Sequence, residues 1–109
     1  MFGANPEELA KGKHWSKLAK LAEKPDESIR VEVAKACGLS KDDEPYNLLI
    51  TLTKDPSPAV QMATIKSLGE VGRPAASTHL QWLAEHIPAD RTEEQKLIHE
   101  ALGKIRTRK

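Results

Sequence analysis

Apolar side chains recur every three or four positions through most of this chain, which is the spacing that gathers them on one face of an α-helix. Prolines and glycines, the residues that most often end helices, stand between the periodic segments. The pattern therefore predicts an all-α fold. The expected helices alternate between two types, which we call B-type, over residues 13–24, 44–54 and 75–87, and A-type, over residues 26–38, 57–72 and 92–105.

One of the A-type segments also has a strand-like feature, because Ile29, Val31 and Val33 are β-branched and alternate along the chain. The segment continues as Ala-Lys-Ala-Cys-Gly, and it has neither a turn pair for a hairpin nor a partner strand elsewhere. We therefore expect a helix here too.

The helices repeat with a period of 31 residues. Leu18 and Leu49 are spaced by this period, and so are Gly38 and Gly69. After Pro88 the register slips by three residues, so that Gly103 comes 34 positions after Gly69. A fixed period of this length is typical of stacked supersecondary units, each of which buries its apolar face only against its neighbours.

The period divides the chain into three helix pairs, and a length of 109 residues suits a single domain, 1–109. In the last pair, the A-type helix is expected to close the stack as a cap. The expected divisions are a short N-terminal helix at 1–12, pairs at 13–38, 44–72 and 75–106, and a frayed tail at 107–109.

Several helix starts carry a side chain that accepts a hydrogen bond from a free backbone N–H. Pro6 and Pro58 suit the first helical position, and Gln95 stands three residues after Thr92, as in a capping box. The expected N-caps are Asn5, Asp26, Ser57, Thr92 and either Ser40 or Asp43.

Composition narrows the classes of partner. Seventeen basic and sixteen acidic residues give a net charge of +1, which argues against nucleic acid as a partner. The longest apolar run, over residues 48–52, is far shorter than the ~20 residues that cross a bilayer, and the N-terminus lacks the apolar core of a signal peptide. We expect a cytoplasmic protein without a membrane segment, either monomeric or weakly self-associating.

Candidate chemistry is sparse. Cys37 takes the position that Leu68 holds in the next copy, so we expect a core side chain and not a reactive thiol. Among the four histidines, His79 and His86 lie two turns apart, about 10 Å along the axis, which is too far for one metal ion. Phosphate loops, nucleophile–base pairs and paired catalytic carboxylates are not recognisable. We expect no enzyme activity, no cofactor and no metal.

Four lysines could form a basic stripe on the first B-type helix. Lys13, Lys17, Lys20 and Lys24 are spaced i, i+4, i+7 and i+11, which would align them on one face. A solvated face is the ordinary explanation of such a stripe. The alternative is a contact with an anion or with nucleic acid, although acidic residues within 23–27 balance the charge.

Trp82 is the most informative single residue. In the 31-residue register it aligns with Thr51 and Lys20, which lie on the polar faces of their helices. A large aromatic side chain at a polar position favours a partner contact, since Trp is enriched at interface hot spots. The alternative is that the slip after Leu83 rotates this helix and buries Trp82. The expected partner-binding residues are Lys20, Asn47, Leu48, Thr51, Thr78, His79 and Trp82.

The best-formed copy of the repeat runs from Asp55-Pro56-Ser57-Pro58-Ala59-Val60 to Ser67-Leu68-Gly69. It resembles HEAT-like repeats of the short kind found in phycobilisome lyases. The resemblance covers the chain from about His14 to Ile105, with departures at Cys37, in place of Leu, and at Glu94, in place of Val. It implies a right-handed α-solenoid of about three repeats, with A-type helices on the convex side and B-type helices lining the concave side.

The resemblance also sets the expected function, which is a non-catalytic scaffold that binds another protein through its concave face. The alternatives are an accessory protein or subunit of an enzyme, either bilin lyase-like or hydroxylase-like, and a weak nucleic-acid binder that uses the lysine stripe. His99-Glu100 is similar to the His-Glu pairs of HEAT-like deoxyhypusine hydroxylases. Those di-iron sites need several such pairs, whereas this chain offers one.

Overall fold

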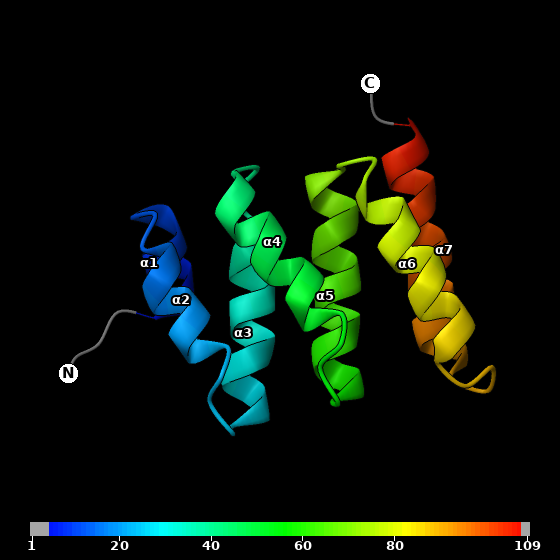
Figure 1. Cartoon of the computed structure of the whole chain (residues 1–109), viewed down its shortest axis with the longest axis horizontal. Coiled ribbons are helices and arrows are strands. Elements are labelled where there is room, and N and C mark those ends of the chain that lie inside the picture. The colour runs from blue at the N-terminus through cyan, green and yellow to red at the C-terminus, as the bar shows by residue number, and fades with distance from the viewer. Residues whose placement is uncertain (1–4, 108–109) are drawn as a thin grey trace.

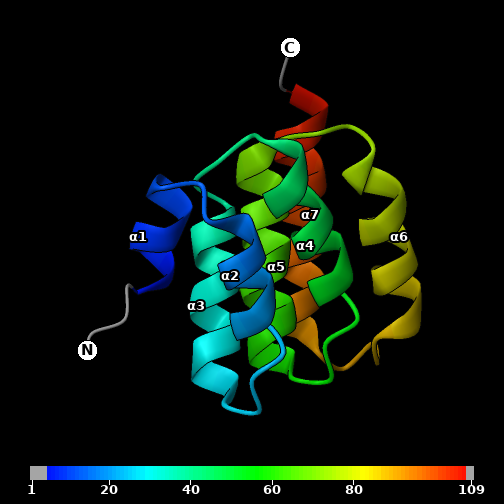
Figure 2. The same ribbon diagram turned by 60° about the vertical axis from the view of Figure 1, so that its left-hand side comes forward.

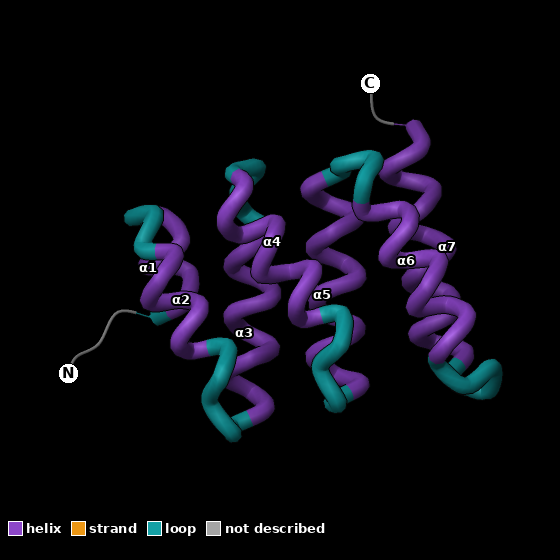
Figure 3. Tube along the Cα trace, viewed as in Figure 1, coloured by secondary structure: helices purple, strands orange, loops and turns teal. Residues whose placement is uncertain are grey.

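The structure is a computed structural model that describes residues 5–107. The described part of the chain contains helices and no strand, which confirms the all-α prediction and makes the segment around Val31 helical (Figures 1 and 3). The helices are α1 Pro6–Lys11, α2 Trp15–Leu21, α3 Glu27–Cys37, α4 Asp43–Leu52, α5 Pro58–Val71, α6 Ala76–His86 and α7 Thr92–Thr107.

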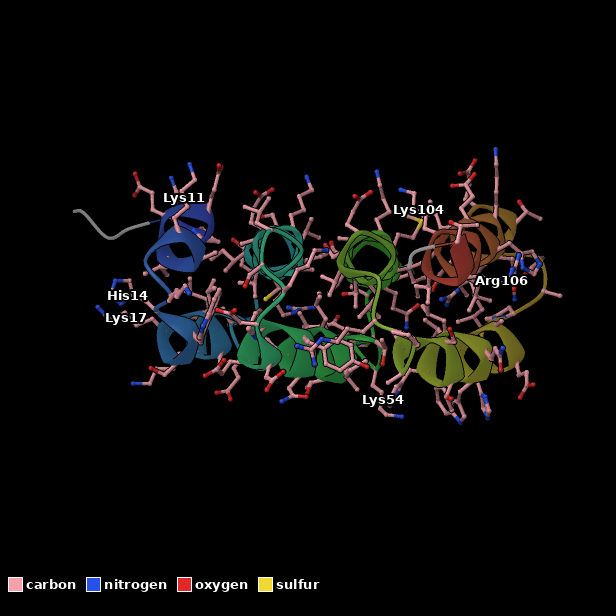
Figure 4. The ribbon with its side chains drawn as sticks, turned by 90° about the horizontal axis from the view of Figure 1, so that it is seen from above. Lys11, His14, Lys17, Lys54, Lys104 and Arg106 are labelled. Carbon is pink, nitrogen blue, oxygen red and sulfur yellow. The ribbon has the colours of Figure 1, made fainter. Side chains whose placement is uncertain are left out.

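The helices stack in two layers, which are seen end-on in Figure 4. We call α1, α3, α5 and α7 the A layer, and α2, α4 and α6 the B layer. Successive A-layer helices lie side by side along the stack (Figures 1 and 2), and the protein measures 41 × 32 × 16 Å. The two types of helix expected from the sequence therefore occupy separate layers.

The N-terminal helix has a larger role than expected. The sequence predicted a short helix that precedes the repeats, whereas α1 packs beside α3 as a further member of the A layer. Its residues Leu9 and Ala10 are buried in the core. Thr107 ends α7, and the rest of the expected tail lies outside the described residues.

Three of the expected N-caps are confirmed. Their side-chain oxygens accept hydrogen bonds from backbone N–H groups two or three residues further along the chain. The bonds are Glu8 N to Asn5 Oδ1 at 2.9 Å, Ser28 N to Asp26 Oδ1 at 2.9 Å, and Val60 N to Ser57 Oγ at 3.3 Å. Pro6 and Pro58 open their helices, as expected.

The other two cap predictions are wrong. The N-cap of α4 is Asp42, and Ser40 Oγ instead accepts a hydrogen bond from Asp42 N at 3.0 Å, ahead of the helix. Thr92 lies inside α7, so no capping box forms. The side chain of Gln95 donates to Ala84 O at 2.9 Å, because α6 packs against α7 and offers a closer acceptor.

The first B-type helix is shorter than predicted. It spans Trp15–Leu21 and not 13–24, because Lys13 takes a left-handed conformation with φ of 59° and cannot continue a helix. Lys24 lies in the turn between α2 and α3. The other B-layer helices end within two residues of their predicted bounds.

The predicted register is confirmed in the core. Leu18, Leu49 and Leu80, which are 31 residues apart, are all fully buried in a single apolar cluster. Cys37 and Leu68, which share a position in the A-type helices, are also fully buried. Burial of aliphatic side chains contributes about 25 cal/mol per Å² of apolar surface, and here it holds the two layers together.

Neighbouring A-layer helices approach closely where a glycine faces a small residue. A Cβ atom on Gly38 would lie 2.8 Å from Ser67 Cβ, and one on Gly69 would lie 3.1 Å from Ala101 Cα. Ser67 Oγ also donates to Ala34 O across this contact at 2.7 Å. Gly103 occupies the same register position, but a Cβ there would meet no atom within 4 Å.

A half-buried ion pair joins two turns at one end of the stack. Arg30 Nε and Nη2 donate to the two carboxylate oxygens of Asp55 at 2.8 and 3.2 Å, and Asp55 Oδ1 also accepts from Ser57 N. Arg30 Nη1 donates to Lys24 O and Pro25 O, both at 2.9 Å. These hydrogen bonds of the Arg30 guanidinium hold the turn before α3 against the turn before α5.

The last helix, α7, has an exposed polar side, but it also buries a carboxylate. Glu94, in the place of Val60 in the preceding copy, is only 2% exposed, and neither carboxylate oxygen has a hydrogen-bond partner in the described part of the chain. Arg91 Nη1 lies 3.5 Å from Glu94 Oε1. Burial raises the pKa of Glu94, and Arg91 only partly offsets that effect.

The glycine contacts predict opposite effects of one substitution. Gly103→Ala should raise the free energy of unfolding by about 1 kcal/mol, because the helix gains propensity and the methyl group enters open space. Gly38→Ala should lower it by about 1 to 3 kcal/mol, because Ser67 must move. Urea unfolding measures both, and effects of the same sign would contradict the predicted close contact.

The burial of Glu94 should make the free energy of unfolding depend on pH. Because its pKa is raised in the folded state, the native protein holds this proton more tightly than the unfolded chain, so the penalty develops as pH rises through that pKa. Glu94→Gln should therefore be more stable than wild type by about 1 kcal/mol at pH 8. The advantage should shrink in acid.

The matched control for this pH series is Glu100→Gln, which removes an exposed carboxylate from the same helix. Its stability relative to wild type should change little with pH. Thermal unfolding of the three proteins across the pH range gives the comparison. A constant difference between Glu94→Gln and wild type would show that Glu94 does not titrate as proposed.

Candidate partner-binding site

Trp82 lies on α6 with 42% of its surface exposed, so it is not buried by the slip in the register. Among the described residues, Trp82 and Leu39 are the large apolar side chains that remain exposed. Leu39 comes after α3 in a turn, whereas Trp82 sits within a helix of the B layer. The structure therefore places the indole at the surface.

Two side chains hold the Trp82 ring. Lys54 Nζ, from the turn after α4, lies 4.1 Å from the ring centroid, within the range of a cation–π contact. The His86 imidazole stacks on the indole with 3.8 Å between centroids and 15° between planes. His86 Nδ1 also lies 2.7 Å from Trp82 O. The indole is thus both exposed and ordered.

Two of the expected partner-binding residues line a hollow between α2 and α4. Asn47 and Leu48 lie on α4, and Thr51 Oγ1 donates to Asn47 O at 3.3 Å. The hollow has a volume of about 360 Å³ and a mostly apolar wall. Its lining residues are Trp15, Ser16, Ala19, Glu44, Pro45, Asn47 and Leu48.

The remaining expected residues are accessible at the surface of the B layer. Lys20 is exposed on α2, and Thr78 and His79 are exposed on α6. The B layer therefore carries two separate candidate contact surfaces, one around Trp82 and the other at the hollow between α2 and α4. We define the Trp82 cluster as Trp82, Lys54 and His86.

Sequence reasoning missed Lys54 and His86 as neighbours of Trp82. A signal existed for His86, because residues four apart on a helix lie on one face. No local signal existed for Lys54, since its contact with Trp82 depends on how α4 and α6 approach each other. Trp15 is only partly buried and lines the hollow.

The predicted lysine stripe is wrong as a feature of one helix. Only Lys17 and Lys20 lie in α2, and Lys13 points its ammonium toward Asp42, with 3.5 Å between Nζ and Oδ2. Figure 4 shows Lys17, with His14, at the N-terminal end of the stack, whereas Lys54 points outward from the B layer. The four lysines therefore do not form one stripe along a single helix.

The candidate chemical groups do not converge. Cys37 is fully buried, and burial raises the pKa of its thiol to about 12, so it packs as a core side chain. Among the described residues, no group of three or more His, Cys, Asp or Glu side chains could hold a metal ion. None of the described helices is both long and apolar enough to cross a membrane.

Comparison with known proteins identifies the repeat. A family model described as HEAT repeats matches residues 16–98, which is more than half of the chain and runs from α2 into α7. A search of curated proteins finds no match. The narrower resemblance to phycobilisome lyases stays a prediction. The chain belongs to the HEAT-repeat family.

Proposed function

We propose that this chain is a non-catalytic binding module that recognises another protein through the outer face of its B layer, with Trp82 as the main anchor. HEAT repeats generally mediate protein–protein interaction. The observation that carries the proposal is the exposed indole of Trp82, held in place by Lys54 and His86.

An ordered, exposed tryptophan suits an anchor for energetic reasons. Burying a large aromatic side chain against a partner removes a large apolar area from water, which is the main source of binding energy at hot spots. The contacts with Lys54 and His86 already restrict the ring, so less side-chain entropy is lost on binding. The hollow at Leu48 offers a second apolar contact on the same layer.

The alternative functions lack comparable support. A hydroxylase-like role needs several His-Glu pairs that converge on metal ions, and the described residues provide no such group. A nucleic-acid role relied on a lysine stripe along one helix, and of those four lysines only Lys17 and Lys20 lie in α2, while Lys13 pairs with Asp42. Protein binding is therefore the function that the geometry supports best.

Replacement of Trp82 tests the proposal. A protein that co-purifies with the wild-type chain from its native cells should be purified and its affinity measured by calorimetry. Trp82→Ala should weaken this affinity by about 30-fold or more, the effect of losing a hot spot worth about 2 kcal/mol. Circular dichroism should show that the variant keeps its helices.

The matched control is His99→Ala, which trims an exposed aromatic ring on α7 of the A layer. It should leave the affinity unchanged. Equal binding by wild type and Trp82→Ala would remove the anchor from the proposal. A loss caused by His99→Ala alone would move the interface to the A layer.

A further inference from the structure

A second hollow lies in the A layer, where α5 and α7 begin side by side at the same end of the stack (Figure 1). Its volume is about 280 Å³. It is lined by Pro58, Met62, Asp90, Arg91, Thr92, Glu93 and Glu94. It does not involve the Trp82 cluster, so a ligand bound in this hollow would be independent of the proposed function.

The hollow exists because a contact found in the preceding pair is missing here. Between α3 and α5, Ser57 Oγ donates to the carboxylate of Glu27, which bridges the two helix starts. In the repeat register, Pro58 takes the place of Glu27 and Arg91 takes the place of Ser57. The proline ring cannot reach across to the next helix, and the space stays open.

Glu94 gives this hollow an unsatisfied acceptor. The residue is 2% exposed and neither carboxylate oxygen has a hydrogen-bond partner in the described chain, although buried carboxylates are normally paired. Arg91 Nη1, 3.5 Å from Oε1, is too distant for a good hydrogen bond. A ligand that donates to these oxygens would remove the cost of leaving them unpaired.

The charges and walls of the hollow indicate the class of ligand. The residues that line the hollow include three acids, Asp90, Glu93 and Glu94, and one base, Arg91, so its net charge favours a cation. Pro58 and Met62 add an apolar wall. The described acidic side chains do not form a group that could hold a metal ion. The class of ligand that suits both the charge and the apolar wall is an organic cation carried on an alkyl chain.

We propose that this hollow receives a lysine side chain from a partner polypeptide. The lysine ammonium donates to the Glu94 carboxylate, and its methylene stem packs against Met62 and Pro58. Arg91, whose side chain is 38% exposed, moves aside toward solvent as the ammonium enters. Glu94 then stays ionised in the complex, and its carboxylate gains the hydrogen-bond donor that it lacks in the described part of the free protein.

Methyl NMR at Met62 tests the site directly, because the chain has two methionines and Met62 lines the hollow. The probe is the peptide acetyl-Gly-Lys-Gly-amide, added to protein labelled at the methionine methyl groups. The Met62 signal should shift until it saturates. The same peptide with its lysine Nε acetylated should cause no saturable shift, because acetylation removes the charge and most of the donors.

Two variants locate the acceptor. Glu94→Gln should weaken binding of the lysine peptide about tenfold or more, the usual effect of losing a charged hydrogen bond. Glu100→Gln removes an exposed carboxylate of α7 that does not line the hollow, and it should leave binding unchanged. Any one of three results would overturn the site: no saturable shift at Met62, an equal shift with the acetylated peptide, or equal binding by Glu94→Gln and wild type.

Discussion

The close approach of neighbouring A-layer helices determines how the repeats stack. At Gly38 and again at Gly69, the absence of a side chain lets the next helix come within van der Waals contact, against Ser67 and Ala101 respectively. Close helix packing of this kind maximises dispersion contacts between backbones and small side chains. It also sets the spacing from one repeat to the next.

That spacing decides where large side chains can go. In the described chain, the aromatic residues Trp15, Tyr46 and Trp82 all lie in B-layer helices. The A layer is built from small and aliphatic residues, which suits its close contacts. Tyr46 is buried beneath Arg73, whereas Trp15 and Trp82 remain partly or largely accessible. The aromatic surface that remains accessible in the described chain thus lies on the B layer.

Much of the fold could be predicted from the sequence, because it depends on local signals and on a repeat. Periodic apolar positions indicated the helices, and Gly38 and Gly69, 31 residues apart, marked equivalent packing sites. The errors came from tertiary contacts and from one unusual backbone conformation. The left-handed conformation of Lys13 shortened α2, and Ala84 drew the Gln95 side chain away from a capping role.

The candidate sites were less predictable than the fold. Register alone aligned Trp82 with polar positions but left open whether it is exposed or buried, and the structure shows that it is exposed. The contact with Lys54 joins elements that are distant in sequence, so no spacing rule could reveal it. Glu94 was recognised as a departure from the repeat, yet only the packing of α5 and α7 shows that its carboxylate is buried and unpaired.

The A layer provides the close packing of this protein, and we propose that the B layer provides the surface for a protein partner. Hydrogen–deuterium exchange of the free chain and of its purified complex tests this division most directly. We expect slower exchange on binding at residues 43–54 and 76–86, which carry α4, Lys54, Trp82 and His86. Protection confined to α3 and α5, with exchange in the B layer unchanged, would contradict this claim.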